Sequence, residues 1–244
     1  MLEKKRASPP SSHVVNPLGR TIYEPEVWRH ELGRFGGRRG RYAESRSGLI
    51  RSFDPIRNCN VSFRKQSHFD HWLTLFLDPE VGGIELYPPP LKLMINGKVT
   101  KADFHFRWER ASDGARMLSF IHESNACDFD ALGQFYNIAG AHGHTLQIWS
   151  PKRLKEKSLF IETAGMARRL LTLRMGLGDY QLHPRIIKIC REEGPKTRKE
   201  LIYRLMIDND RFDYVAFWLY SQGRLSSSIK GVPYGDHTIF AYVP

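Results

Sequence analysis

The stretch GKVTKADFHFRWERASDGARMLSFIHES, Gly97–Ser124, decides the fold that this sequence predicts. Between Val99 and Trp108 apolar and polar residues alternate, which predicts a strand with one buried face. Ser112-Asp113-Gly114 has the composition of a turn, and Met117–Ile121 is a second apolar run. We therefore expect two antiparallel strands joined by a turn.

The same stretch places polar groups where a metal site could form. Alternation puts Phe104 on one side of the first strand and Asp103 and His105 on the other. The second strand ends in the polar triplet His122-Glu123-Ser124. An acidic residue on one strand beside a polar triplet on the next is how metal-dependent nucleases hold a hard cation through oxygen. Asp103 is the expected metal ligand.

Length and charge limit the classes of protein to which this chain can belong. The chain has 244 residues, 41% of them hydrophobic, enough for one large or two small domains. The formal net charge is +11. Basic residues outnumber acidic ones by 6 over residues 1–60 and by 7 over residues 151–244, while acidic residues lead by 2 over residues 61–150. Two basic ends favour a polyanionic partner such as DNA, and solvated surface lysines are the alternative.

Cysteine usage and hydropathy predict the compartment. Cys59, Cys127 and Cys190 are isolated, which is typical of free thiols in a reducing environment. No apolar run approaches the roughly 18 residues of a membrane span. The first residues are charged and rich in proline and serine, so we expect neither a secretory signal nor a membrane anchor. The expected location is the cytoplasm of a bacterial or phage-infected cell.

Patterns along the chain predict three segments. These are a basic, partly disordered arm over residues 1–50, an α/β domain over residues 51–175 and a second domain over residues 176–244. In the α/β domain we expect helices at Gln66–Leu77, Asp130–Ala141 and Pro151–Leu173, and further strands at Val81–Leu86, Leu91–Ile95 and Thr145–Trp149. Asn96-Gly97 predicts a hairpin turn. This order indicates a mixed central sheet flanked by helices.

The last segment predicts three short helices and a β-hairpin, the composition of a winged helix. Thr197 and Glu200 form a capping-box pattern, and Asp210 is the expected cap of a third helix over residues 211–222. In a winged helix the third helix usually reads a DNA groove and the wing, here Lys230–Asp236, touches backbone. Three-helix cores also dock proteins. The predicted phosphate contacts are Arg38, Arg39 and Arg41 in the arm and Arg198, Lys199, Arg211, Arg224 and Lys230 in this segment.

Several motifs in a fixed order carry a family resemblance. They are FLDP (76–79), VGGIELYPPP (81–90), NGKVTKADFHFR (96–107) and GHTLQIWSPKRLKEKSLFIETAGMARRLL (143–171), followed by the winged-helix segment. In order and spacing the chain resembles the TnsA-like transposon-end endonucleases. The resemblance implies a restriction-endonuclease-like domain before the winged helix. It also implies Mg²⁺-dependent cleavage of double-stranded transposon DNA beside a partner transposase.

The catalytic set of that family is only partly present. Asp103, in ADF, matches the metal-bridging Asp. His68 falls where the family has a Glu on the first helix, and Asp70 is the neighbouring acid. In the triplet, His122 replaces the acidic residue, Glu123 follows it, and Ser124 replaces the Lys. Ser124 cannot supply the positive charge of that Lys, so the transition state of hydrolysis loses a large part of its stabilisation. We therefore expect an impaired site with at most weak Mg²⁺ or Mn²⁺ binding.

Three functions follow from these patterns. The first is a DNA-binding protein with a degenerate nuclease fold, acting in DNA recognition or nucleoprotein assembly. The second is an active metal-dependent nuclease that uses Asp70, Asp103 and Glu123 with histidine support, since imidazole and carboxylate together suit Zn²⁺ or Mn²⁺. The third is a protein-docking factor that binds a transposase or a phage protein.

Overall fold

A computed structural model describes residues 14–15, 21–22, 49–122, 129–174 and 179–244. Contacts divide the chain into two units, Met1–Arg46 and Ser47–Pro244. The first unit contains the antiparallel strands β1 (Val14–Val15) and β2 (Thr21–Ile22). The predicted arm contacts Arg38, Arg39 and Arg41 lie outside the described residues.

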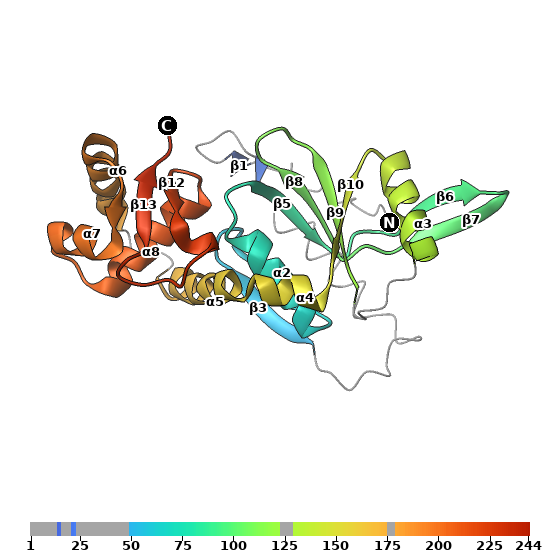
Figure 1. The fold of residues 1–244 in the computed structure, drawn as a ribbon, viewed down its shortest axis with the longest axis horizontal. Helices are drawn as coiled ribbons and strands as arrows, with labels where there is room; N and C mark the ends of the chain where they lie inside the picture. Colours follow the sequence, from blue (N-terminus) through green and yellow to red (C-terminus); the bar gives the residue numbers. More distant parts are fainter. Residues whose placement is uncertain (1–13, 16–20, 23–48, 123–128, 175–178) are drawn as a thin grey trace, which may run out of the picture. The chain divides into compact units, whose positions relative to one another are not determined.

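The second unit is built around a mixed four-stranded sheet (Figure 1). Its strands are β5 (Val81–Leu86), β8 (Phe106–Arg110), β9 (Arg116–Ile121) and β10 (Thr145–Trp149), in the order β10-β9-β8-β5. β9 and β10 run parallel, while the other neighbours are antiparallel. The predicted α/β domain with a mixed sheet flanked by helices is confirmed at this level.

Helices cover both faces of this sheet because strand residues alternate between them. Leu118 and Leu146 pack on α3 (Phe129–Ala141), where Ile138 and Ala139 are fully buried. The other face carries Phe106 and Trp149, which contact α2 (Gln66–Phe76). An additional hairpin, β3 (Ile50–Asp54) and β4 (Cys59–Phe63), lies beside α2 and was not predicted.

The predicted single strand Val99–Trp108 is wrong in one respect. Its first half is β7 (Lys98–Ala102), which pairs only with β6 (Leu91–Ile95) in a separate hairpin. Residues 103–105 belong to no strand, and β8 begins at Phe106. Burial nevertheless alternates through the break, since Ala102, Phe104 and Phe106 are each at most 2% exposed. The alternation of buried and exposed side chains therefore continues through residues 103–105, although the β-strand hydrogen bonding is interrupted there.

The predicted helix Pro151–Leu173 is two helices. α4 (Pro151–Glu156) begins at Ser150, whose hydroxyl accepts a hydrogen bond from the Arg153 backbone N–H. α5 (Ser158–Leu173) follows after Lys157. α5 packs against both α2 and α8 (Asn209–Ser221), so it is shared between the sheet and the C-terminal helices.

The C-terminal part has the element order helix, strand, two helices and two strands. These are α6 (Leu182–Glu193), β11 (Lys196–Thr197), α7 (Arg198–Leu205), α8, β12 (Leu225–Ser227) and β13 (Ile239–Tyr242), with the 3₁₀ turns η1 (Asp179–Gln181) and η2 (Ser228–Lys230). The three strands form an antiparallel sheet. The Thr197–Glu200 capping box is confirmed. The cap of α8 is Asp208, not Asp210, because the Asp208 carboxylate accepts from the Arg211 backbone N–H.

α8 is buried on more than one side. Phe212, Val215 and Phe217 are all fully buried. α8 packs against α5, α6 and β12. A helix that is apolar around most of its circumference is an interior helix. Arg211, Tyr214 and Trp218 lie along one side of α8 and are only half-buried, so the role of this helix in reading DNA stays a prediction.

A buried ion pair holds α7 and α8 together. The Arg198 guanidinium, 9% exposed, donates two hydrogen bonds to Asp213, at 2.8 and 2.9 Å, and one to Asp236 at 2.8 Å. The hydrogen bonds to Asp213 raise the pKa of Arg198. Arg198 is therefore a core residue, and its predicted phosphate contact is not retained.

We expect Asp213→Ala to destabilise the chain by about 3–5 kcal/mol, because Arg198 would lose its buried partner. Urea unfolding followed by circular dichroism measures the change. Glu192→Ala is the matched control, since Glu192 lies 3.8 Å from Arg191 and both side chains are more than half exposed. That pair contributes at most about 1 kcal/mol. Equal losses in the two variants would contradict a dominant role for the buried pair.

Candidate functional site

Four residues from different strands gather at one end of the central sheet, which we call the sheet-end site. Tyr87 follows β5, His105 precedes β8, His122 follows β9 and Trp149 ends β10. The backbone N–H of Tyr87 donates to the His105 carbonyl at 2.8 Å, and that of His122 donates to the Trp149 carbonyl at 2.7 Å. This is the end at which the sequence predicted a nuclease site.

His105 occupies the break in the strand pattern. Its backbone N–H donates to the Ser119 carbonyl at 3.0 Å, and its Nδ1 accepts from the Ile121 backbone N–H at 2.9 Å. The ring stacks on Phe120, with centroids 5.1 Å apart. Because Nδ1 is an acceptor, the neutral ring carries its proton on Nε2. The His105 side chain thus accepts the hydrogen bond of the Ile121 backbone N–H, which a backbone carbonyl would accept in a regular strand.

His68 and Tyr87 lie against this ring. His68, 3% exposed, has its ring centroid 4.2 Å from that of His105 and its Nδ1 2.9 Å from the Tyr87 hydroxyl. The same hydroxyl accepts from the Arg64 backbone N–H at 2.8 Å, and the Arg64 guanidinium lies 4.6 Å from the centre of the Tyr87 ring. Tyr87 has a φ of 50°, which is rare before a proline. Strained backbone of this kind concentrates at functional sites.

His71 lies one helical turn beyond His68 and is fully buried. Its ring contacts Trp149 at 4.4 Å and Phe106 at 4.8 Å between centroids. Its Nδ1 lies 3.3 Å from the Thr74 hydroxyl, whereas its Nε2 has no hydrogen-bond partner in the described part of the chain. The histidine therefore fills apolar space between α2 and the sheet.

Burial and neighbouring cations keep these rings neutral. Burial lowers the pKa of His105 to about 3, and His68, Arg64 and Lys65 act in the same direction. Burial lowers the pKa of His71 well below its usual value, with a further contribution from Arg153. His105 and His71 are therefore neutral rings with the cationic side chains of Arg64, Lys65 and Arg153 nearby.

The predicted catalytic residues do not converge on a metal site. Asp103 is exposed and takes part in no ion pair among the described residues. Asp70 is two residues beyond His68, on another side of α2, and accepts from Gln66 at 2.7 Å. Partial burial raises the pKa of Asp70. His122 is half-buried, and Glu123 and Ser124 lie outside the described residues.

In the described ranges, no three His, Cys, Asp or Glu side chains come together so as to hold an ion. A hard cation needs carboxylate oxygens, and of the predicted ligands that the structure describes, Asp103 is exposed and Asp70 is bonded to Gln66. The described donors therefore do not form a site for Mg²⁺, Mn²⁺ or Zn²⁺. We derive no reaction step through a metal.

The predicted DNA contacts of the C-terminal part divide into paired and unpaired cations. Arg211 pairs with Asp179 at 2.5 Å, and Lys230 bonds both oxygens of Asp78 at 2.9 Å. These carboxylates compete with phosphate for the two side chains. Lys199 and Arg224 are exposed and enter no ion pair in the described part of the chain.

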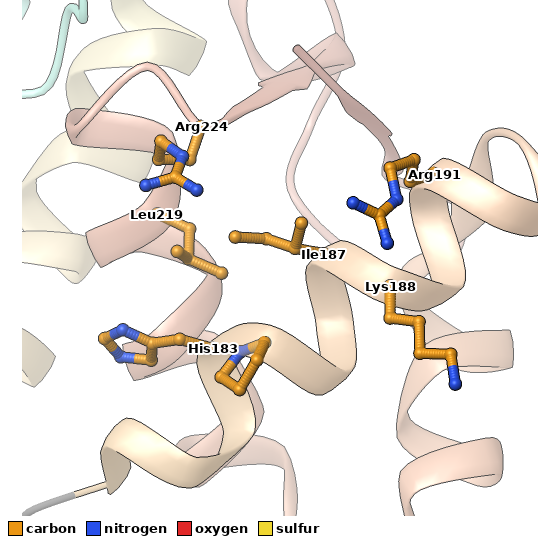
Figure 2. Close-up of a pocket in the computed structure, with 7 residues that line it drawn as sticks. His183, Ile187, Lys188, Arg191, Leu219 and Arg224 are labelled. Atoms are coloured by element: carbon orange, nitrogen blue, oxygen red, sulfur yellow. The ribbon is translucent and has the colours of Figure 1, made fainter. Parts of the chain in front are cut away.

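Arg224 lies at the edge of an open pocket of about 330 Å³ between α6 and the end of α8. Figure 2 shows Ile187 and Leu219 at its centre, with Arg224 and Arg191 on opposite sides. The lining residues are His183, Pro184, Ile187, Lys188, Arg191, Leu219 and Arg224. The pocket is apolar inside and cationic at its rim.

α4 carries cations that sequence reasoning did not single out. Lys152, Lys155 and Lys157 are exposed and join no ion pair among the described residues. Arg153 is anchored beside the sheet-end site: its guanidinium donates to the Ile148 carbonyl at 2.9 Å and lies 4.2 Å from the Trp149 ring centre. The signal in the sequence was PKRLKEK directly after a predicted strand.

Comparison with protein-family models gives no match to this chain, and comparison with curated proteins gives none either. In the described ranges, no helix has the length and apolar character needed to cross a membrane.

We expect the free energy of unfolding to fall as the pH is lowered from about 6.5 towards 3, because His105 binds a proton far more readily in the unfolded chain. Each such histidine contributes a slope of up to about 1.4 kcal/mol per pH unit. His105→Asn keeps an acceptor for Ile121 but cannot titrate, so its stability should depend less on pH. Urea unfolding at a series of pH values measures the slope.

The control for this measurement is His237→Asn, since His237 is exposed in the C-terminal part. It should retain the wild-type slope. If His105→Asn and His237→Asn have the same pH dependence as the wild type, the buried neutral state of His105 is contradicted.

Proposed function

We propose that this chain is a DNA-binding protein with a restriction-endonuclease-like core, similar to TnsA-like transposon-end endonucleases but without their hydrolytic chemistry. The order α2, β5, β8, β9, α3 and β10, with the β6–β7 hairpin inserted between β5 and β8, supports that core. Duplex DNA is the proposed ligand, and the role is DNA recognition or nucleoprotein assembly.

One observation carries this proposal: the unpaired cations of α4 stand next to the sheet-end site. Lys152, Lys155 and Lys157 lie within two turns of helix that begins directly after β10. Arg153 is fixed against Trp149 by its hydrogen bond and its contact with the ring. Exposed cations without carboxylate partners bind phosphates by releasing condensed counterions. The surface where a nuclease would hold its substrate therefore suits DNA binding.

The same surface does not suit hydrolysis. A nuclease of this class polarises phosphate with a metal held by converging carboxylates. Here His68 and His105 are engaged with Tyr87 and Ile121, and Asp103 is exposed. We propose that the core binds DNA without cutting it.

The C-terminal part supports the winged-helix assignment by its element order. Its third helix is covered by α5, and Lys230 of the wing bonds Asp78 at the end of α2. We therefore assign it a role in the fold and in protein contact rather than groove reading. A partner transposase remains part of the proposal. The exposed Tyr203 on α7 and Met206 at its C-cap, at 83% and 92%, support a protein contact there.

We expect Lys152→Gln/Lys155→Gln/Lys157→Gln to weaken DNA binding, because three phosphate contacts are lost. The slope of log K against log salt should become shallower by about 3. Filter binding or mobility shift of a duplex between about 50 and 200 mM salt measures it.

The matched control removes three exposed cations outside α4 by Arg169→Gln/Arg185→Gln/Lys188→Gln. These residues also join no ion pair in the described ranges, and the net charge falls equally. The control should keep most of the wild-type slope. Wild-type chain that fails to bind at low salt, or binds without salt dependence, refutes the proposed function.

Supercoiled plasmid incubated with the protein and Mg²⁺ or Mn²⁺ should stay intact, and Asp103→Ala should behave as the wild type does. The reason is that no further His, Cys, Asp or Glu side chains gather with Asp103 among the described residues. Gel electrophoresis measures nicking. Metal-dependent nicking by the wild type that Asp103→Ala abolishes would establish the active-nuclease alternative instead.

A further inference from the structure

The β6–β7 hairpin has an outward face that nothing in the described part of the chain covers. Figure 1 shows the hairpin extending from the central sheet beside α3. One face, with Leu91 and Leu93, packs on the α3 side of the core. The opposite face carries the directly paired residues Lys92↔Lys101 and Met94↔Val99.

The lysine pair on this face is uncompensated. Lys92 and Lys101 stand directly opposite each other, and like charges in that position destabilise a sheet. Both are exposed, and neither joins an ion pair among the described residues. The arrangement attracts an anion that lies across the two strands.

Next to the lysines lies an exposed apolar pair. Met94 is 69% exposed and Val99 is 59% exposed. A flat apolar pair in water costs free energy and invites aggregation on an edge, unless a partner covers it. Apolar side chains flanked by lysines match a DNA groove, where phosphates line the rims and apolar groups lie within.

The hairpin has the dimensions and position for this role. A major groove about 12 Å wide admits a two-stranded β-ribbon. The tight turn at Asn96-Gly97 uses φ values of 50° and 73°, as a two-residue hairpin turn requires. β7 runs directly into Asp103 and His105, so the hairpin is joined to the sheet-end site by three residues.

We propose that the outward face of the β6–β7 hairpin lies in the major groove of duplex DNA, with Lys92 and Lys101 on phosphates and Met94 and Val99 against thymine methyl groups. This inference rests on the proposed DNA-binding function and specifies how a groove is contacted. It assigns the contact with base edges to the hairpin rather than to α8, which packs against α5, α6 and β12.

The first test removes the charge pair. Lys92→Gln/Lys101→Gln should make the salt slope of duplex binding shallower by about 2. It should leave the melting temperature unchanged or higher, because like-charge repulsion is removed. Arg185→Gln/Lys188→Gln, which removes the same charge from α6, is the control and should keep the wild-type slope.

The second test reads the methyl contacts. Wild-type protein should bind an A·T-rich duplex about fourfold more tightly than the same duplex with uracil for thymine, the effect of one buried methyl group. Met94→Gln/Val99→Ser should bind the two duplexes equally, because neither new side chain carries a methyl group. The α4 triple variant should bind both more weakly but keep the thymine preference.

The results separate this inference from the proposed function. If the wild type binds DNA and the α4 variant binds less well, the proposed function stands. Unchanged binding by both hairpin variants, or a thymine preference that survives Met94→Gln/Val99→Ser, then overturns the hairpin inference alone. Hairpin variants that bind DNA like the wild type but lose a protein partner would also overturn it. No duplex binding at low salt overturns both.

Discussion

The hydrogen bonds of His105 are the constraint on which the sheet-end site depends. The residue donates its backbone N–H to Ser119, accepts from Tyr87 through its carbonyl, and accepts from Ile121 through Nδ1. One residue thus joins the ends of β5, β8 and β9 where the regular ladder has stopped. Its imidazole is used as a structural acceptor, which is why it is buried, neutral and unsuited to hold a hard cation.

The surroundings of His105 follow from that use. His68 packs on its ring, Tyr87 bonds His68, and Arg64 covers Tyr87. In a hydrolytic site this volume would hold carboxylates and water. Here the described part holds rings in contact with one another, and the Arg64 guanidinium lies over the Tyr87 ring at its edge. The packing that buries His68 and His105 therefore also places a cation beside the site.

Much of this fold is predictable from the sequence, and the failures have local causes. Val81–Leu86, Leu91–Ile95 and Thr145–Trp149 occur with the predicted bounds because alternation and turn residues mark both ends. The interruption of the strand at residues 103–105 cannot be seen in the sequence, because buried and exposed residues keep alternating through it. The burial of Arg198 in an ion pair could not be predicted, since its partner Asp213 is distant in sequence. The burial of α8 was visible in its nearly continuous apolar run, but α5 as its cover was not.

The position of α5 has a consequence for how the chain reaches its native state. α5 packs on α2 and on α8 together, so neither neighbour can be lost without exposing one of its sides. During synthesis α5 is made before α8, and the side that α8 covers faces water until the last third of the chain is complete. We therefore expect Ser47–Pro244 to fold late and cooperatively. In a chain that ends before α8, the apolar side of α5 would be exposed and could associate with other molecules.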